Sequence, residues 1–264
     1  MTRIIILLLF CSSQVFSQEY CKHEDITKDD GTYLKAIPAR CTSLDLSPTL
    51  PAPLYALSSE QKKRLLLGDD GAKKIANMLH DNNSIKFLSL HKNLIGLKGA
   101  KALANVLKNH NKTLKALDLS NNTIKSDGAL EIVKSVMHKD DFELDLSLNG
   151  IDDNLIKGMD KLVEQDPNKT FNFETILLLN NFIKDEGARY LAKILDNHKH
   201  LKKLNLEGND IKDSGAIALA EALMNHETLE WFGVAHNKIG KKGLKELNQS
   251  NEHNKKLEIK NNQY

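Results

Sequence analysis

Apolar and polar residues alternate in short stretches along the chain, and a second period follows each stretch. In LKALDLSNN (114–122), the buried-type residues Leu117 and Leu119 alternate with polar neighbours. This two-residue period predicts a short strand with one buried face. In GAKALANVL (99–107), apolar residues instead recur every three and four positions, which predicts a helix. Each unit is therefore predicted to be a strand, a turn and a helix.

The unit recurs along most of the chain. An asparagine ends each predicted strand, and the steps between successive asparagines are 29, 27, 32, 28 and 28 residues. Such a period is typical of a solenoid of stacked units. The asparagine amides are expected to bond backbone groups where the chain leaves the strands. The predicted ladder consists of Asn93, Asn122, Asn149, Asn181, Asn209 and Asn237. A glycine follows each ladder asparagine by six residues, except where Leu155 takes its place.

Stacking of these units predicts a curved fold. One unit cannot cover its own apolar side, but neighbours can bury a continuous core between strands and helices. Parallel strands pair about 4.8 Å apart and helices pack at about 10 Å, so the strand layer must lie inside the bend. The predicted fold class is α/β: a curved horseshoe with a parallel sheet on the concave face and helices on the convex face.

The units resemble leucine-rich repeats. With 28 to 29 residues and a full helix, they are similar to the ribonuclease-inhibitor-like subtype, which is also found in Ran GTPase-activating proteins and in NOD-like receptors. The resemblance covers roughly Leu57 to the C-terminus and implies a horseshoe, or part of one. Ribonuclease inhibitor alternates cysteine with asparagine at the ladder position, whereas this chain has asparagine throughout. The resemblance therefore does not imply ribonuclease binding, and no assisting residue of a GTPase activator is matched.

The ends of the chain depart from the repeat. Residues 1–17 (MTRIIILLLFCSSQVFS) combine one basic residue, an apolar run and small residues near Ser17, which predicts a signal peptide cleaved after Ser17. The alternative is a buried hydrophobic strand. Residues 18–60 are predicted to be an N-terminal cap, because prolines interrupt their one strand-like segment. Residues 61–264 are predicted to form the solenoid, with about six regular repeats and degenerate terminal units.

The cysteines and the charge balance narrow the cellular location and the partners. Removal of the signal would take away Cys11 and leave Cys21 and Cys41, which can form a disulfide in an oxidising compartment. Two free thiols are the alternative. The predicted location is secreted or periplasmic. The net charge of +2 comes from interleaved signs, so nucleic acid is not an expected partner. No membrane span is expected after cleavage, and a monomer is predicted.

The concave face is the predicted site for a protein partner, because the curvature leaves it open. Trp231 is expected to be a contact anchor, with burial under the last strand as the alternative. Leu177 and Leu179 are predicted to be exposed beside Leu148, unless the strand register slips. The carboxylates of Asp118, Glu143 and Asp145 fall on adjacent strands and suit a basic ligand, although a solvated charged surface explains them equally well. The predicted contact residues are Trp231, Phe87, Asp118, Glu143, Asp145, Leu177, Leu179 and Glu207.

Catalysis is not indicated. The chain has no glycine-rich phosphate loop and no G-x-S-x-G motif, and its polar residues follow the repeat instead of converging. His110, His198 and His226 come after successive helices, where a cationic side chain is favoured. No metal site, cofactor or catalytic residue is predicted. Sequons occur at Asn82, Asn111, Asn121, Asn168 and Asn248, and each is interpreted as a surface acceptor if the source is eukaryotic.

The sequence therefore predicts an exported module that binds a partner protein. In a bacterium that lives with animal or amoebal cells, the resemblance suggests a secreted effector that acts on a host protein. A regulator of an enzyme, such as a GTPase activator-like protein, is one alternative. A structural protein of the envelope or cell surface is another.

Overall fold

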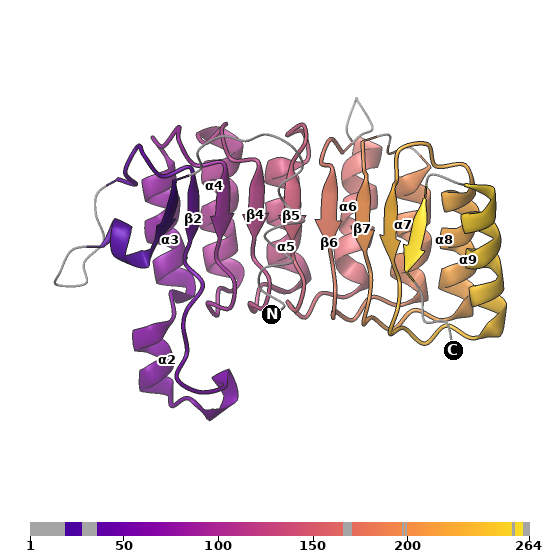
Figure 1. Ribbon diagram of the computed structural model, residues 1–264, viewed down its shortest axis with the longest axis horizontal. Helices are drawn as coiled ribbons and strands as arrows, with labels where there is room; N and C mark the ends of the chain where they lie inside the picture. Colours follow the sequence, from indigo (N-terminus) through magenta and orange to yellow (C-terminus); the bar gives the residue numbers. More distant parts are fainter. Residues whose placement is uncertain are drawn as a thin grey trace.

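Parallel strands in sequence order form one open sheet in the computed structural model (Figure 1). The structure describes residues 19–27, 36–165, 171–196, 198, 200–254 and 257–260. Within these ranges, nine strands pair in the order β1 to β9. Their bounds are β1 Tyr20–Lys22, β2 Ser43–Asp45, β3 Phe87–Ser89, β4 Ala116–Asp118, β5 Glu143–Asp145, β6 Thr175–Leu177, β7 Lys203–Asn205, β8 Trp231–Gly233 and β9 Glu258–Lys260. The predicted signal peptide, residues 1–17, lies outside the described residues.

The helices form a second layer behind the sheet (Figure 1). Their bounds are α3 Gly68–Leu79, α4 Leu97–Asn109, α5 Lys125–Val136, α6 Asp153–Gln165, α7 Asp185–Leu195, α8 Asp213–Met224 and α9 Lys241–His253. In Figure 1 the row of helices reaches beyond the last strand, as expected because helices pack farther apart than strands pair. The predicted fold class is confirmed: the chain forms an α/β leucine-rich-repeat solenoid.

A constant register aligns equivalent positions of neighbouring units. The middle residue of each strand points into the core, and Leu88, Leu117 and Leu144 are consecutive Cα partners. The same row continues through Ile176, Leu204 and Phe232, all of them buried. The residues on either side of this row point to the open face. The alternation that predicted the strands therefore also decides which side chains face a partner.

The asparagine amides tie each unit to the one before. Asn122 Nδ2 donates to the carbonyl oxygens of Leu119 in its own unit and Leu90 in the preceding unit, at 2.8 and 3.0 Å. Its Oδ1 accepts from the backbone N–H of Asn93. All six asparagines donate to the preceding unit, at the carbonyls of Leu46, Leu90, Leu119, Leu146, Leu178 and Leu206. These bonds satisfy backbone groups that the turns leave unpaired.

A second set of bonds explains the glycine that follows most ladder asparagines. Asp185 Oδ1 accepts from the backbone N–H groups of Lys212 and Gly215, so an aspartate at one helix start caps the next helix. A Cβ at Gly215 would lie 2.7 Å from that oxygen. Asp69 and Asp213 make the same bonds to the units that follow them.

Leu155 shows why the glycine is dispensable in one unit. The helix before it carries Ser126 at the aspartate position. The Ser126 hydroxyl accepts from the backbone N–H of Asp152 at 2.9 Å, so no carboxylate reaches toward residue 155. A side chain is therefore accommodated there, and Leu155 is fully buried.

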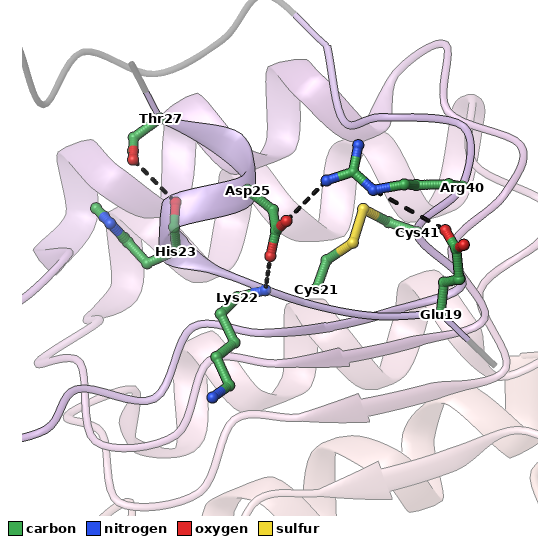
Figure 2. Close-up of polar contacts among 8 residues, drawn as sticks. All are labelled: Glu19, Cys21, Lys22, His23, Asp25, Thr27, Arg40 and Cys41. Carbon is green, nitrogen blue, oxygen red and sulfur yellow. Dashed lines mark hydrogen bonds and ion pairs between the residues drawn. A yellow bond between two sulfur atoms is a disulfide. The ribbon is translucent and has the colours of Figure 1, made fainter. Parts of the chain in front are cut away.

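The N-terminal strands extend the sheet before the first regular unit. A disulfide joins Cys21 of β1 to Cys41, just before β2 (Figure 2). Beside it, the Arg40 guanidinium donates to Asp25 at 2.7 Å (Figure 2). The backbone N–H of Lys22 and the Arg40 guanidinium hold the pKa of Asp25 below its usual value. The boundaries predicted for the cap, 18–60, stay a prediction.

The described residues before α3 form no regular repeat helix. They contain the short helices η1 His23–Ile26 before β2, and η2 Leu54–Ala56 and α2 Ser59–Leu65 after it. The last two extend below the two layers (Figure 1). In the described part of the chain, no helix has the length and apolar character needed to cross a bilayer.

Candidate functional site

A hollow of about 290 Å³ lies on the open face of the sheet, across β5 to β8 and the turns beside them. Its lining includes five of the predicted contact residues, namely Glu143, Asp145, Leu177, Leu179 and Trp231. The other three predicted residues do not line it. Phe87 lies on β3, Asp118 lies on β4 beside Asp145, and Glu207 follows β7.

One wall of the hollow is apolar. Leu177 and Leu179 are half-buried, whereas Leu178 between them is fully buried. The strand therefore has the register that turns Leu177 and Leu179 toward the open face. Leu148, in the turn after β5, is 43% exposed and adds to the same wall.

Trp231 closes the hollow on the C-terminal side. Its indole is half-buried, although β9 pairs with its strand. A Cβ at Gly233 would lie 2.5 Å from the ring atom Cη2 of Trp231, so the indole lies across the glycine two residues on. Gly233 thus leaves room for the ring to lie flat along the open face. A flat, partly exposed indole offers contact area to a partner at little conformational cost.

Glu143 and Asp145 form an acidic wall of the hollow, and Asp118 lies beside Asp145 on the next strand. Asp118 and Asp145 are Cα partners on β4 and β5, and both side chains are buried. Asp118 accepts from the hydroxyls of Ser89 and Ser120 and from the Ser120 backbone N–H, at 2.6 to 2.9 Å. Asp145 accepts from the backbone N–H of Ser147 at 2.8 Å. Asp118 thus has hydrogen-bond donors from two residues, whereas the donors to Asp145 come from Ser147.

Burial makes ionisation of this wall costly. Burial, followed by the neighbouring Asp118 carboxylate, raises the pKa of Asp145 well above its usual range. Burial also raises the pKa of Glu143 to about 7; Lys203 opposes this change and Glu174 adds to it. Both groups therefore exchange protons near neutral pH, and a cation brought to this wall would favour their charged forms.

The chemistry of the hollow is that of a binding site. An apolar wall adjoins carboxylates, while the hydroxyls of Ser89 and Ser120 are bonded to Asp118. Among the residues that the structure describes, no group of three or more His, Cys, Asp or Glu is placed to hold a metal ion.

The interpretation of the histidines as cationic side chains at helix ends is wrong for His198. This side chain is 2% exposed; its ring stacks on Phe171 and is tilted against Phe173, with ring centroids 5.5 Å away in both pairs. Burial lowers the pKa of His198 to about 3, so the ring is neutral. His226 is also buried, and its Nδ1 accepts from the backbone N–H of Leu229.

Sequence reasoning missed a second ladder, in the turns between helices and strands. Asn111 Oδ1 accepts from the backbone N–H of Leu114, and its Nδ2 donates to the carbonyl of Asn82 at 2.9 Å. Asn254 donates in the same way to His226, at 2.8 Å. The available signal was an asparagine or histidine three residues before the apolar residue that precedes most strands, at Asn82, Asn111, His198, His226 and Asn254.

This ladder corrects the interpretation of two sequons. Asn82 and Asn111 are 8% and 1% exposed, so they are not surface acceptors. Asn248 is exposed on α9, and Asn121 is partly exposed in the turn after β4. Asn168 lies outside the described residues.

Comparisons with known proteins identify the repeat. Residues 110–133 and 197–220 match the family model described as Leucine Rich repeat. These segments contain β4 with the start of α5, and β7 with the start of α8. These two segments are therefore similar to leucine-rich repeats. No curated protein matches the chain.

A similar chain is found in the solved structure titled "Crystal structure of TLR13-ssRNA13 complex". The similarity covers 87% of this chain and 37% of that chain, with 17% identity and a TM-score of 0.37. This chain therefore spans well under half the length of that structural neighbour.

Proposed function

We propose that this protein binds a partner protein through the concave face of its solenoid, with the hollow beside Trp231 as the centre of the contact. The observation that carries the proposal is that a half-buried indole and half-buried leucines line one hollow on the open face of the sheet. Apolar patches of this kind on a soluble surface mark interaction sites, and aromatic anchors dominate their energetics. Phe87, Asp118 and Glu207 provide the outer part of the same surface.

The proposal includes export from the cytoplasm. The disulfide between Cys21 and Cys41 is compatible with an oxidising compartment, which agrees with a signal peptide at residues 1–17. Where the producer lives with animal or amoebal cells, the partner is a host protein. The proposal also assigns the repeats to the ribonuclease-inhibitor-like subtype, which their length and the full helix of each unit favour.

A capture experiment with matched variants tests the binding role. The full chain, expressed with its own leader and purified after export, is immobilised as wild type, Trp231→Ala and Tyr55→Ala. Tyr55 is 89% exposed on η2, away from the sheet, so it controls for the loss of an exposed aromatic ring. The proposal requires a partner that the wild type and Tyr55→Ala retain and Trp231→Ala loses. Equal retention of every partner by Trp231→Ala would refute it.

A further inference from the structure

The hollow has two unlike walls. Trp231, Leu177 and Leu179 come from β8, from β6 and from the turn after β6, whereas Glu143 and Asp145 come from β5, which pairs with β6. A volume of about 290 Å³ is at the lower end of the range for ligand pockets, and it fits one side chain better than a cofactor. An occupant must therefore combine an apolar part with a group that a carboxylate attracts.

The acidic wall has Lys203 as a positive neighbour but no ion pair. Within the described residues, no ion pair reaches Glu143 or Asp145. The charged groups that face them are Asp118 from β4, Glu174 before β6 and Lys203 from β7, while His91 lies at the far end of the hollow. Asp118 repels Asp145, Lys203 attracts Glu143, and Glu174 is paired with Lys202 at 3.2 Å, so the wall keeps an excess of negative charge.

The spacing inside the hollow suits a long side chain. Leu177 is the Cα partner of Asp145 on the neighbouring strand, about 4.8 Å away, whereas the backbone of Trp231 lies three strand spacings from Glu143, at about 14 Å. An aliphatic stem that lies on Leu177 can therefore place its end beside the carboxylates. Arginine has the required stem, and its planar guanidinium bonds two carboxylate oxygens and stacks on indole rings.

We propose that the hollow is a subsite for one arginine side chain of the partner, with the stem against Leu177 and Trp231 and the guanidinium between Glu143 and Asp145. The subsite rests on the proposed function, because it identifies the partner surface as one with an exposed arginine. The apolar wall provides the burial, and the guanidinium neutralises carboxylates that are otherwise costly to ionise.

The single tryptophan gives a direct assay for the subsite. Trp231 fluorescence is followed while n-butylguanidinium, a mimic of the arginine side chain, is added at pH 8. The neutral isostere n-butylurea and the point charge n-pentylammonium are titrated in parallel. We expect saturable binding of the guanidinium probe. Each of the other two compounds should bind at least about tenfold more weakly, and a tenfold difference in affinity equals about 1.4 kcal/mol.

Variants that each lack one carboxylate test where the guanidinium group of the probe binds. Glu143→Gln should weaken n-butylguanidinium about tenfold, as expected for loss of one close charge partner. Glu131→Gln, on the helix layer in α5, removes the same charge away from the hollow and should leave the affinity unchanged. The affinity should also fall as the pH is lowered from 8 to 5, because Glu143 and Asp145 take up protons in this range.

Four outcomes would overturn the subsite. They are a fluorescence response that does not saturate, equal binding of n-butylurea, binding of n-pentylammonium at least as tight as the guanidinium, and equal effects of Glu143→Gln and Glu131→Gln. The capture experiment distinguishes this failure from that of the proposed function. If Trp231→Ala loses the partner while n-butylguanidinium does not bind, the protein-binding role stands and the arginine subsite is wrong. If the probe binds as expected while Trp231→Ala retains every partner, the hollow binds a guanidinium group, but the protein-binding role and the assignment of that group to a partner are both wrong.

Discussion

Replacing Glu143 by glutamine should stabilise the protein, and only above neutral pH is the full gain expected. Glu143 lies in β5 at the edge of the hollow, and burial raises its pKa from 4.5 to about 7. In the unfolded chain the same carboxyl ionises at its ordinary pKa. The folded state therefore bears a cost for this charge that glutamine, with the same shape and no charge, does not have.

The magnitude follows from the change in pKa. At 1.36 kcal/mol per pKa unit, a rise from 4.5 to about 7 corresponds to about 3 kcal/mol when both states are ionised. Because the side chain is partly exposed, solvent screening reduces the expected gain to about 2 kcal/mol.

The direction of the pKa change determines the pH range over which the stability of the wild type changes. Between pH 4.5 and about 7 the unfolded state binds fewer protons at this site than the folded state, so the wild type loses stability as the pH rises. Above about pH 7 the wild type has lost the full amount of stability, and below pH 4.5 it loses none at this site. The advantage of Glu143→Gln should therefore grow from near zero at pH 4 to its full value at pH 8.5.

Urea denaturation followed by far-ultraviolet circular dichroism at pH 4, 5.5, 7 and 8.5 measures this difference. Glu258→Gln is a matched control, because Glu258 occupies the equivalent strand position in β9 and is exposed. It should change stability little at any of these pH values. A Glu143→Gln protein that is no more stable than wild type at pH 8.5, or a difference that does not vary with pH, would refute the reasoning.

Three further predictions concern the scaffold. Cys21→Ala combined with Cys41→Ala should lower the free energy of unfolding by about 3 kcal/mol, since the bridge closes a loop with a sequence separation of 20; urea denaturation of the variant and wild type measures this, and equal midpoints would contradict it. Gly215→Ala should cost about 1 to 3 kcal/mol, because its Cβ meets the Asp185 carboxylate. Thermal denaturation should show a smaller cost for the same substitution in an Asp185→Ala background, and an equal cost in both backgrounds would exclude this contact as the cause. In a glycosylating host, the folded secreted protein should carry no glycan at Asn111, because its Nδ2 donates to Leu79 and Asn82 in the interior; peptide mass mapping that finds a glycan there would reject the assignment.

Most of the architecture follows from local patterns. The two-residue period fixes which face of each strand is buried, and the three-and-four spacing fixes the apolar side of each helix. Because the same pattern recurs in every unit, one register of strands satisfies all of them, from Leu88 to Phe232. The position of Leu177 and Leu179 on the open face follows from the same alternation.

Only the assembled structure decides what lies beside each side chain. Asp118 and Asp145 are 27 residues apart in sequence, and their mutual repulsion arises because their strands pair in register. The Asp185 cap on the following helix, the neutral state of His198 and the position of the Trp231 ring over Gly233 likewise depend on neighbours in space. The sequence period determined the fold of this protein, because burial of one face is a local requirement. Charge, burial and contact in the hollow were decided by the tertiary structure, since desolvation and electrostatic coupling depend on groups that the stacking of units brings together.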